Sequence, residues 1–149
     1  MNYEWQDSYS IGIESLDLQH KSLFYLCSEA EHCLHAEGRD AIAEFHDILY
    51  NMWMFADEHF KAEEKLLYVY GYPALVEHQN EHERYLESLT EFLVMATSGV
   101  IDKHGVNDFL RNWWLQHILV DDMAFKGVFR GKDNIVNPDS DVDDGFTRF

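Results

Sequence analysis

The sequence predicts an all-α protein: an up-down-up-down four-helix bundle with an extended N-terminal arm and an acidic C-terminal tail. Three observations support this fold class. Apolar residues recur at helical spacing in four long segments. Short joints that contain Gly38, Gly71-Tyr72-Pro73 and Ser98-Gly99 separate these segments. Only 2 prolines occur in 149 residues, and polar turn residues are sparse before about residue 130, which disfavours a fold of many short strands.

The first fifteen residues are expected to form an extended arm that lies across the bundle. Trp5, Tyr9 and Ile11-Gly12-Ile13 make this segment too apolar for a loose tail. The first helix is expected over residues 17–37, with Ser15 or Asp17 as its N-cap and a stop at Gly38. Its apolar positions are Leu16, Leu23, Phe24, Leu26, Cys27, Ala30 and Leu34.

The second and third helices are expected over residues 40–69 and 73–97. The second begins at Asp40, and a wide apolar stripe marks its buried face. This stripe comprises Ile42, Phe45, Ile48, Leu49, Met52, Trp53, Phe55, Ala56 and Phe60. Pro73 suits the first turn of the third helix, where a missing N–H costs nothing. The third helix would bury Leu75, Tyr85, Leu86, Leu89, Phe92, Leu93 and Met95.

The fourth helix is expected over residues 107–127, with Asn107 as its N-cap. Its apolar positions are Phe109, Leu110, Trp113, Trp114, Leu115, Ile118, Leu119, Met123 and Phe125. From Gly131 onward, Asp, Asn and Gly dominate. We therefore expect one domain over residues 1–130 and an acidic tail over residues 131–149. The tail would be partly ordered through Phe146 and Phe149, or disordered.

The charge balance excludes two classes of partner. The chain has 28 acidic and 11 basic residues, a formal net charge of −17. Nucleic acids and anionic membrane surfaces both attract basic patches, so neither is an expected partner. No stretch approaches the roughly 18 apolar residues needed to span a bilayer. Membrane insertion is therefore not expected either.

The N-terminus and the cysteines favour a cytoplasmic location. The first seven residues lack the basic and apolar regions of a signal peptide. Cys27 and Cys33 lie six residues apart in one expected helix, on different faces and too distant to form a disulfide. Two unpaired thiols are typical of a reducing compartment.

Possible metal ligands occur at matching depth in all four expected helices. The 9 histidines are a high number for this length. His59 and Glu63 lie four residues apart, as do His78 and His82, so each pair lies on one helix face. The first expected helix contributes His20, and the fourth contributes His117, Asp121 and Asp122. Spacing alone favours Asp121 over Asp122, because Asp121 follows His117 by four residues. We predict one metal-binding layer in the bundle.

The chemistry of this set favours two metal ions. Five imidazoles and two carboxylates exceed the needs of one ion, and a carboxylate can bridge two. Imidazole with carboxylate suits iron, although manganese is also compatible. Two other motifs are weaker. His78 to His82 fits the H-x-x-E-H pattern of inverted zinc proteases, with Glu81 as the base, but the chain lacks a strand-rich cleft. A ferritin-like site needs two Glu-x-x-His motifs, and we find one, from Glu29 to His32.

From about Trp5 to Met123 the chain resembles hemerythrins, and especially the single-domain bacterial hemerythrins. The resemblance rests on four motifs in order. These are Ile11-Gly12-Ile13 with Asp17-Leu18-Gln19-His20-Lys21, His59-Phe60-Lys61-Ala62-Glu63-Glu64, Gly71-Tyr72-Pro73 with His78 and His82, and Trp113-Trp114-Leu115-Gln116-His117-Ile118 with Asp122. The resemblance implies a non-haem di-iron site in a four-helix bundle that binds O2 reversibly.

The resemblance also implies a role for each ligand. One iron would be held by three histidines, which are His78, His82 and His117. The other iron would be held by two, which are His20 and His59. Glu63, Asp122 and an oxo or hydroxo group would bridge the two ions, which would be Fe2+ in the deoxy form and Fe3+ in the oxy and met forms. The family pattern selects Asp122, which then needs a long reach or a local helix distortion. Asp121 and Glu64 are expected to be solvated.

Counting these ligands leaves one iron with an open position for O2. We expect an apolar, dry pocket there, although the same side chains equally fit ordinary core packing. The residues three or four positions from the ligands are Phe24, Phe55, Leu66, Leu67, Trp113 and Ile118. Trp114 stands where the family usually has leucine, which we expect to change the shape of or access to the pocket.

The leading functional hypothesis is an O2-binding protein, a monomer, for storage, transport or delivery to an O2-consuming oxidase. One alternative is an O2 or redox sensor that acts through a signalling partner. Another is a di-iron scavenger of peroxide or NO. The open position suits O2 carriage better than the oxidation of a bulky substrate, so the chain is not expected to be an enzyme.

Overall fold

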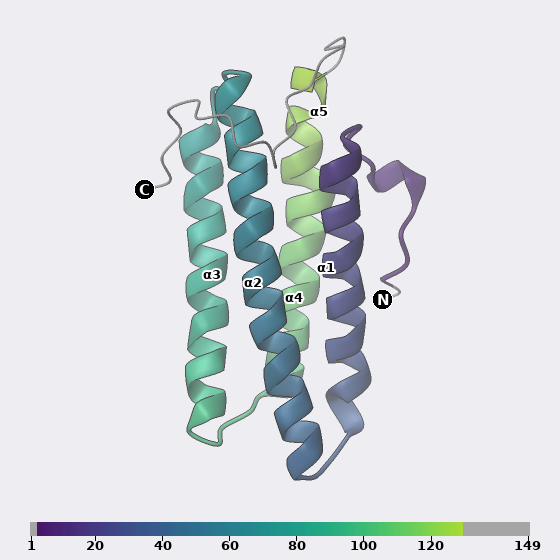
Figure 1. Cartoon of the computed structure of the whole chain (residues 1–149), viewed down its shortest axis with the longest axis vertical. Coiled ribbons are helices and arrows are strands. Elements are labelled where there is room, and N and C mark those ends of the chain that lie inside the picture. Colours follow the sequence, from purple (N-terminus) through teal and green to yellow (C-terminus); the bar gives the residue numbers. More distant parts are fainter. Residues whose placement is uncertain (1–2, 130–149) are drawn as a thin grey trace.

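The computed structural model describes residues 3–129, in which four long helices form an antiparallel bundle (Figure 1). The elements are η1 (Asp7–Tyr9), α1 (Glu14–His32), η2 (Cys33–His35), α2 (Arg39–Val69), α3 (Leu75–Thr97), α4 (Lys103–Gln116), η3 (His117–Asp122) and α5 (Met123–Phe129). The segment η3 is a π-helix that joins α4 to α5. The described residues contain no strand. The all-α, four-helix class predicted from the sequence is confirmed.

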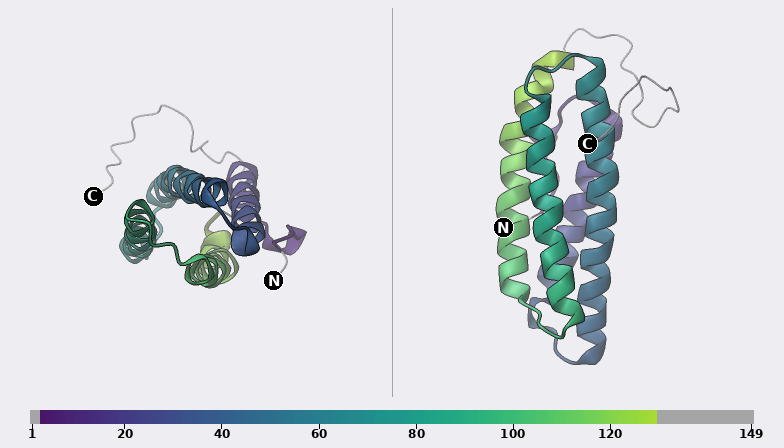
Figure 2. Two further views of the ribbon diagram at one scale, coloured as in Figure 1. Left: turned by 90° about the horizontal axis from the view of Figure 1, so that it is seen from below. Right: turned by 90° about the vertical axis from the view of Figure 1, so that its left-hand side faces the viewer.

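Neighbouring helices alternate in direction around a shared core. Helix α2 packs against α1 and α3, and α4 packs against α1. Viewed from below, the four helices surround a common centre (Figure 2). The largest fully buried side chains there include Trp114, Tyr85, Phe24, Phe45 and Phe60. None of the helices described is long and apolar enough to cross a bilayer.

The fourth helix begins earlier than expected because another residue caps it. Asp102 is its N-cap, and the carboxylate of Asp102 accepts a hydrogen bond from the Gly105 N–H at 2.9 Å. Asn107 is buried inside the helix and donates its amide to the carbonyls of Ala30 and Lys103. The prediction that Asn107 caps this helix was therefore wrong. Its side chain ties α4 to α1 instead.

Asp17 holds the arm against the bundle, and neither Asp17 nor Ser15 caps α1, so the expectation that one of them would do so was wrong. The N-cap position is Ile13, without a side-chain hydrogen bond. Asp17 instead accepts hydrogen bonds from the Ser10 hydroxyl at 2.5 Å and the Ile11 N–H at 3.0 Å. Ile11 and Ile13 are buried in a small cluster. The extended arm therefore contributes to the core, as its composition predicted.

Replacing Asp17 by alanine should release the arm. Hydrogen bonds to a charged acceptor contribute about 1.5–3 kcal/mol, and Asp17 is only partly buried, so we expect a loss near the lower end of that range. Urea unfolding of the metal-free protein measures it. Glu14→Ala, an exposed change in the first turn of α1, is the matched control. Equal unfolding free energies for the two variants would contradict this role of Asp17.

Two features predicted from the sequence have different outcomes. Cys27 and Cys33 are both free and buried, and burial raises the pKa of each thiol, so both are unreactive core residues.

The acidic tail over residues 131–149, with Phe146 and Phe149, lies outside the described residues. The domain boundary near residue 130 stays a prediction.

Candidate metal centre

All seven predicted ligand side chains meet in one buried layer of the bundle. They come from every long helix: His20 from α1, His59 and Glu63 from α2, His78 and His82 from α3, and His117 and Asp122 from η3. His78 is 8% exposed, and the other six are at most 1% exposed. The matched depth predicted from the sequence therefore exists in the fold.

The π-helical segment explains why Asp122, and not Asp121, faces His117. A π-helix forms i→i+5 hydrogen bonds and is wider than an α-helix, so positions five apart lie closer to one face. The carboxylate Oδ1 of Asp122 lies 3.1 Å from Nε2 of His117. Asp121 is partly exposed and lies 3.4 Å from the amide of Gln116. The local helix distortion, one of the two ways in which Asp122 could reach the layer, is present, and the structure places Asp122 rather than Asp121 in the cluster of candidate ligands.

Glu63 directs its two oxygens to different sets of histidines. Oε2 lies 3.1 Å from Nε2 of His59 and 3.9 Å from Nε2 of His20. Oε1 faces the Nε2 atoms of three other histidines. These are His78 in close contact, His82 at 3.3 Å and His117 at 3.6 Å. Glu63 therefore lies between a pair of histidines and a trio.

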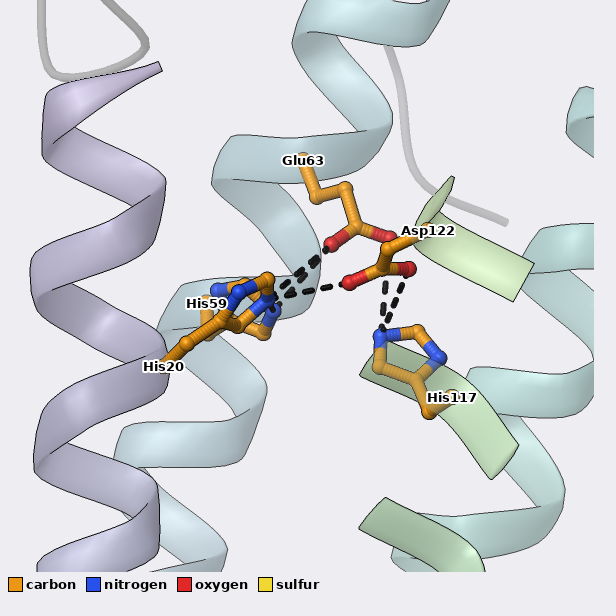
Figure 3. Close-up of side chains that lie close together, drawn as sticks. All are labelled: His20, His59, Glu63, His117 and Asp122. Carbon is orange, nitrogen blue, oxygen red and sulfur yellow. Dashed lines mark hydrogen bonds and ion pairs between the residues drawn. The ribbon is translucent and has the colours of Figure 1, made fainter. Parts of the chain in front are cut away.

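Asp122 divides its oxygens in the same way. Oδ2 lies 2.9 Å from Nε2 of His20. Oδ1 lies 3.1 Å from Nε2 of His117 and 3.5 Å from Nε2 of His78. Figure 3 shows His20 and His59 on one side of the two carboxylates and His117 on the other. We call His20 and His59 the histidine pair, and His78, His82 and His117 the histidine trio.

The buried polar atoms of this layer fit metal ions. Among the described residues, Nε2 of His82 and Nε2 of His117 are buried and make no hydrogen bond of acceptable geometry. Buried polar atoms normally have one, and here lone pairs of nitrogen and oxygen face one another. Cations between them would satisfy several atoms at once. The donor atoms form two overlapping groups, each within 4.8 Å, that share Glu63 and His117.

Most of the imidazoles are neutral and ready to bind a metal. Burial lowers the pKa of His20 and of His82 to about 4, and it also lowers the pKa of His59 and His117. His78 differs: burial opposes its charged form, but hydrogen bonds to Asp122 and Glu63 raise its pKa to about 10. Metal binding would therefore displace a proton from His78.

The two carboxylates differ in the same environment. Burial alone would raise the pKa of Glu63, but electrostatic interaction with His117 and hydrogen bonds with the surrounding imidazoles hold it well below its usual range. Burial and then the charge of Glu63 raise the pKa of Asp122 to about 6. In the metal-free protein, Glu63 is therefore the more strongly ionised carboxylate.

The stability of the metal-free protein should pass through a maximum near pH 6.5. The pKa values of His20 and His82 rise from about 4 to the ordinary 6.5 on unfolding, so their protonation favours the unfolded chain and stability increases from pH 4 to 6.5. Asp122 opposes this trend, because its pKa is about 6 in the folded protein and falls to the ordinary 3.8 on unfolding. It is one group against the two histidines, so the net change still favours the folded protein as pH rises to 6.5. His78 has a folded pKa of about 10, so its contribution disappears as pH rises from 6.5 towards 10. Urea unfolding at each pH measures the curve; stability that rises steadily to pH 9 would contradict it.

The structure adds contacts behind the ligands that the sequence did not predict. Nδ1 of His59 donates to Oε1 of Gln19 at 2.8 Å, and Nδ1 of His82 donates to Oε1 of Glu64 at 2.8 Å. Glu64 is fully buried, so the expectation that it is solvated was wrong. The spacing in the sequence could have predicted that Glu64 is buried. Glu64 follows Phe60 by four residues and precedes Leu67 by three, and both of these residues are fully buried.

The predicted pocket residues have different positions. Phe55 is 46% exposed, so it does not line an enclosed pocket. Phe24 packs against the arm, with its ring 5.8 Å from that of Tyr9. Trp113 stacks on His117 at 4.5 Å between ring centroids. The buried Leu66, Leu67 and Ile118 belong to the two apolar clusters; a pocket role for them and for Trp113 stays a prediction.

A small surface pocket borders the layer at His78. This pocket has a volume of about 180 Å³, and His78 lies in its wall with Tyr72, Glu77, Glu81 and Asp121. His78 is also the most exposed of the seven side chains.

Comparisons with known proteins give the family. The model of the hemerythrin HHE cation-binding domain matches residues 11–128. A bacteriohemerythrin from Clostridium acetobutylicum is 28% identical over 126 residues, which are 83% of this chain and 98% of that protein. One from Stenotrophomonas maltophilia is 28% identical over 121 residues, 81% of this chain and 77% of that protein. A hemerythrin-like protein from Naegleria gruberi is 25% identical over 126 residues, 85% of this chain and 92% of that protein.

A solved structure shares the fold. This crystal structure of a leucine-to-phenylalanine mutant superimposes with a TM-score of 0.76 and 20% sequence identity, over 86% of this chain and 98% of the other. The family match and the His/Glu/Asp cluster together indicate a di-iron site. Since the family model covers most of the chain, the protein belongs to the hemerythrin HHE cation-binding domain family.

Proposed function

We propose that this protein binds O2 reversibly at a di-iron centre. The proposal rests on one observation: each of two buried carboxylates directs one oxygen to the histidine pair and the other to the histidine trio. Such a carboxylate can bridge two metal ions. The pair would hold one iron, the trio the other, and Glu63 and Asp122 would bridge them.

The unequal number of histidines suggests where O2 binds. The ion at the histidine pair has one protein ligand fewer than the ion at the trio, so its coordination has room for a small molecule. The bound iron ions would supply this open position and the electrons that O2 binding requires. The protein's part is to hold the ligands in place and to keep water out. Phe60 and Trp113 contribute to both, because they stack on His82 and His117.

The surroundings of the layer favour carriage of O2 over catalysis on a larger substrate. The surface pocket that borders the layer at His78 is about 180 Å³, which suits a small molecule rather than a drug-sized ligand. We therefore propose O2 storage, transport or delivery to an O2-consuming oxidase. The monomeric state and the cytoplasmic location remain predictions.

Visible absorption of the iron-loaded, reduced protein tests this function. Spectra are recorded before O2 is added, after it is added, and after it is removed under argon. A band that appears with O2 and disappears on its removal is the expected result. One-way conversion to a ferric spectrum, or turnover of peroxide or NO with a reductant, would instead favour the scavenger. O2-dependent capture of a signalling partner would favour the sensor.

A further inference from the structure

The fully buried carboxylate of Glu64 has no place in the proposed ligand set. Glu64 directly follows Glu63 on α2, so its side chain points about 100° away around the helix. A buried carboxylate is costly unless hydrogen bonds or charges compensate for its lost hydration. One of its contacts is with Nδ1 of His82, at 2.8 Å from Oε1. The contact lies on the far side of the imidazole from the two bridging carboxylates.

This contact fixes both the tautomer and the plane of the His82 ring. A carboxylate accepts, so Nδ1 carries the proton and the lone pair lies on Nε2. That Nε2 lies 3.3 Å from Oε1 of Glu63, inside the layer. The ring of Phe60 stacks on the imidazole at 3.8 Å between centroids and 8° between planes. Together, Glu64 and Phe60 leave His82 one orientation, in which it presents a donor atom to the metal position.

The pair and the trio are supported by different chemistry. In the pair, Nδ1 of His59 donates to the neutral amide oxygen of Gln19 at 2.8 Å. In the trio, Nδ1 of His82 donates to the negatively charged carboxylate of Glu64. A carboxylate pulls the N–H proton more strongly than an amide does, which makes the opposite ring nitrogen a stronger donor.

We infer that Glu64 is a positioning residue that increases the difference between the two metal positions, so that the histidine trio binds its ion more tightly than its additional imidazole alone would allow. This inference rests on the ligand set of the proposed function. Negative charge behind His82 favours the ion of higher charge at the trio. The histidine pair has the neutral amide of Gln19 behind His59 instead. Its ion is therefore held less strongly, at the metal position that has room for a small ligand.

Cobalt titration tests the inference without iron or O2. Co2+ binds to imidazole and carboxylate, and its visible bands report its coordination. The native protein is expected to bind Co2+ in two steps of different affinity. Glu64→Gln keeps the shape and the acceptor but removes the charge; it should weaken the tighter step by about tenfold to 100-fold, the usual size of such effects. Its visible bands should also shift, and Glu64→Ala should weaken that step further.

Two variants make the test decisive. Gln19→Glu places a carboxylate behind His59, and we expect it to tighten the weaker step and narrow the gap between the two affinities. Glu58→Gln removes an exposed carboxylate of the same helix and should change neither step. Native affinities and bands in a folded Glu64→Gln protein would overturn the inference. So would unchanged affinities in Gln19→Glu, a variant whose change is at a partly exposed position.

The outcome separates this inference from the proposed function. If the native protein binds two Co2+ ions unequally and Glu64→Gln weakens the tighter step, the inference stands even where the iron-loaded protein shows no reversible O2 band. If the O2 band is reversible but Glu64→Gln leaves both affinities unchanged, the proposed function stands and the inference fails.

Discussion

Replacing Asp122 by asparagine is expected to remove at least one of the two iron ions, whereas Asp121→Asn should leave both bound. Asp122 is fully buried, and its oxygens face His20 and His117 at 2.9 and 3.1 Å. Asparagine keeps the volume but lacks the charge and the second oxygen, so it cannot bridge two ions. Iron per chain, measured after loading and desalting, checks the result.

Asp121→Asn is the matched control, because it makes the same change at the adjacent residue. Asp121 is partly exposed and contacts Gln116 rather than a histidine of the layer. His117→Ala provides the reference for a damaged site, and it should also lose metal. A centre that survives Asp122→Asn but not Asp121→Asn would show that the wrong carboxylate has been assigned.

The helical part of the site was predictable because it depends on periodicity alone. His59 with Glu63, and His78 with His82, lie one turn apart in regular helices, so their common face follows from the spacing. Asp122 was a different case. Its position depends on a π-helical segment, and helical spacing carries no sign of that distortion. The prediction of Asp122 came from the resemblance to hemerythrins, and the structure supplies the geometric reason.

The contacts that the sequence missed join different helices. Glu64 meets His82 across α2 and α3, and Gln19 meets His59 across α1 and α2. Such pairs depend on the register between helices, which one helix's pattern does not contain. Phe55 shows the same limit. It lies next to Ala56 on the edge of the apolar stripe, and the coverage by neighbouring helices, rather than periodicity, leaves it 46% exposed.

Replacing Trp114 by alanine should cause the largest loss of stability, about 3–5 kcal/mol, the usual range for a buried tryptophan. Trp114 is 0% exposed, and its indole N–H donates to the hydroxyl of Tyr85 at 2.9 Å. The substitution would leave a cavity beside Phe60, whose ring lies 5.9 Å away. The free energy of unfolding in urea, measured without metal, checks this expectation.

Two controls separate cavity formation from the lost hydrogen bond. Tyr85→Phe removes only the acceptor of the Trp114 N–H and should cost about 1–3 kcal/mol, because it leaves a buried donor unpaired. Val94→Ala, at a position that is 62% exposed, should change stability by less than about 0.5 kcal/mol. If Tyr85→Phe costs as much as Trp114→Ala, the hydrogen bond is the main contribution and the cavity argument fails. If the alanine variant loses several times more, the packing of this tryptophan stabilises the helices that hold the metal layer.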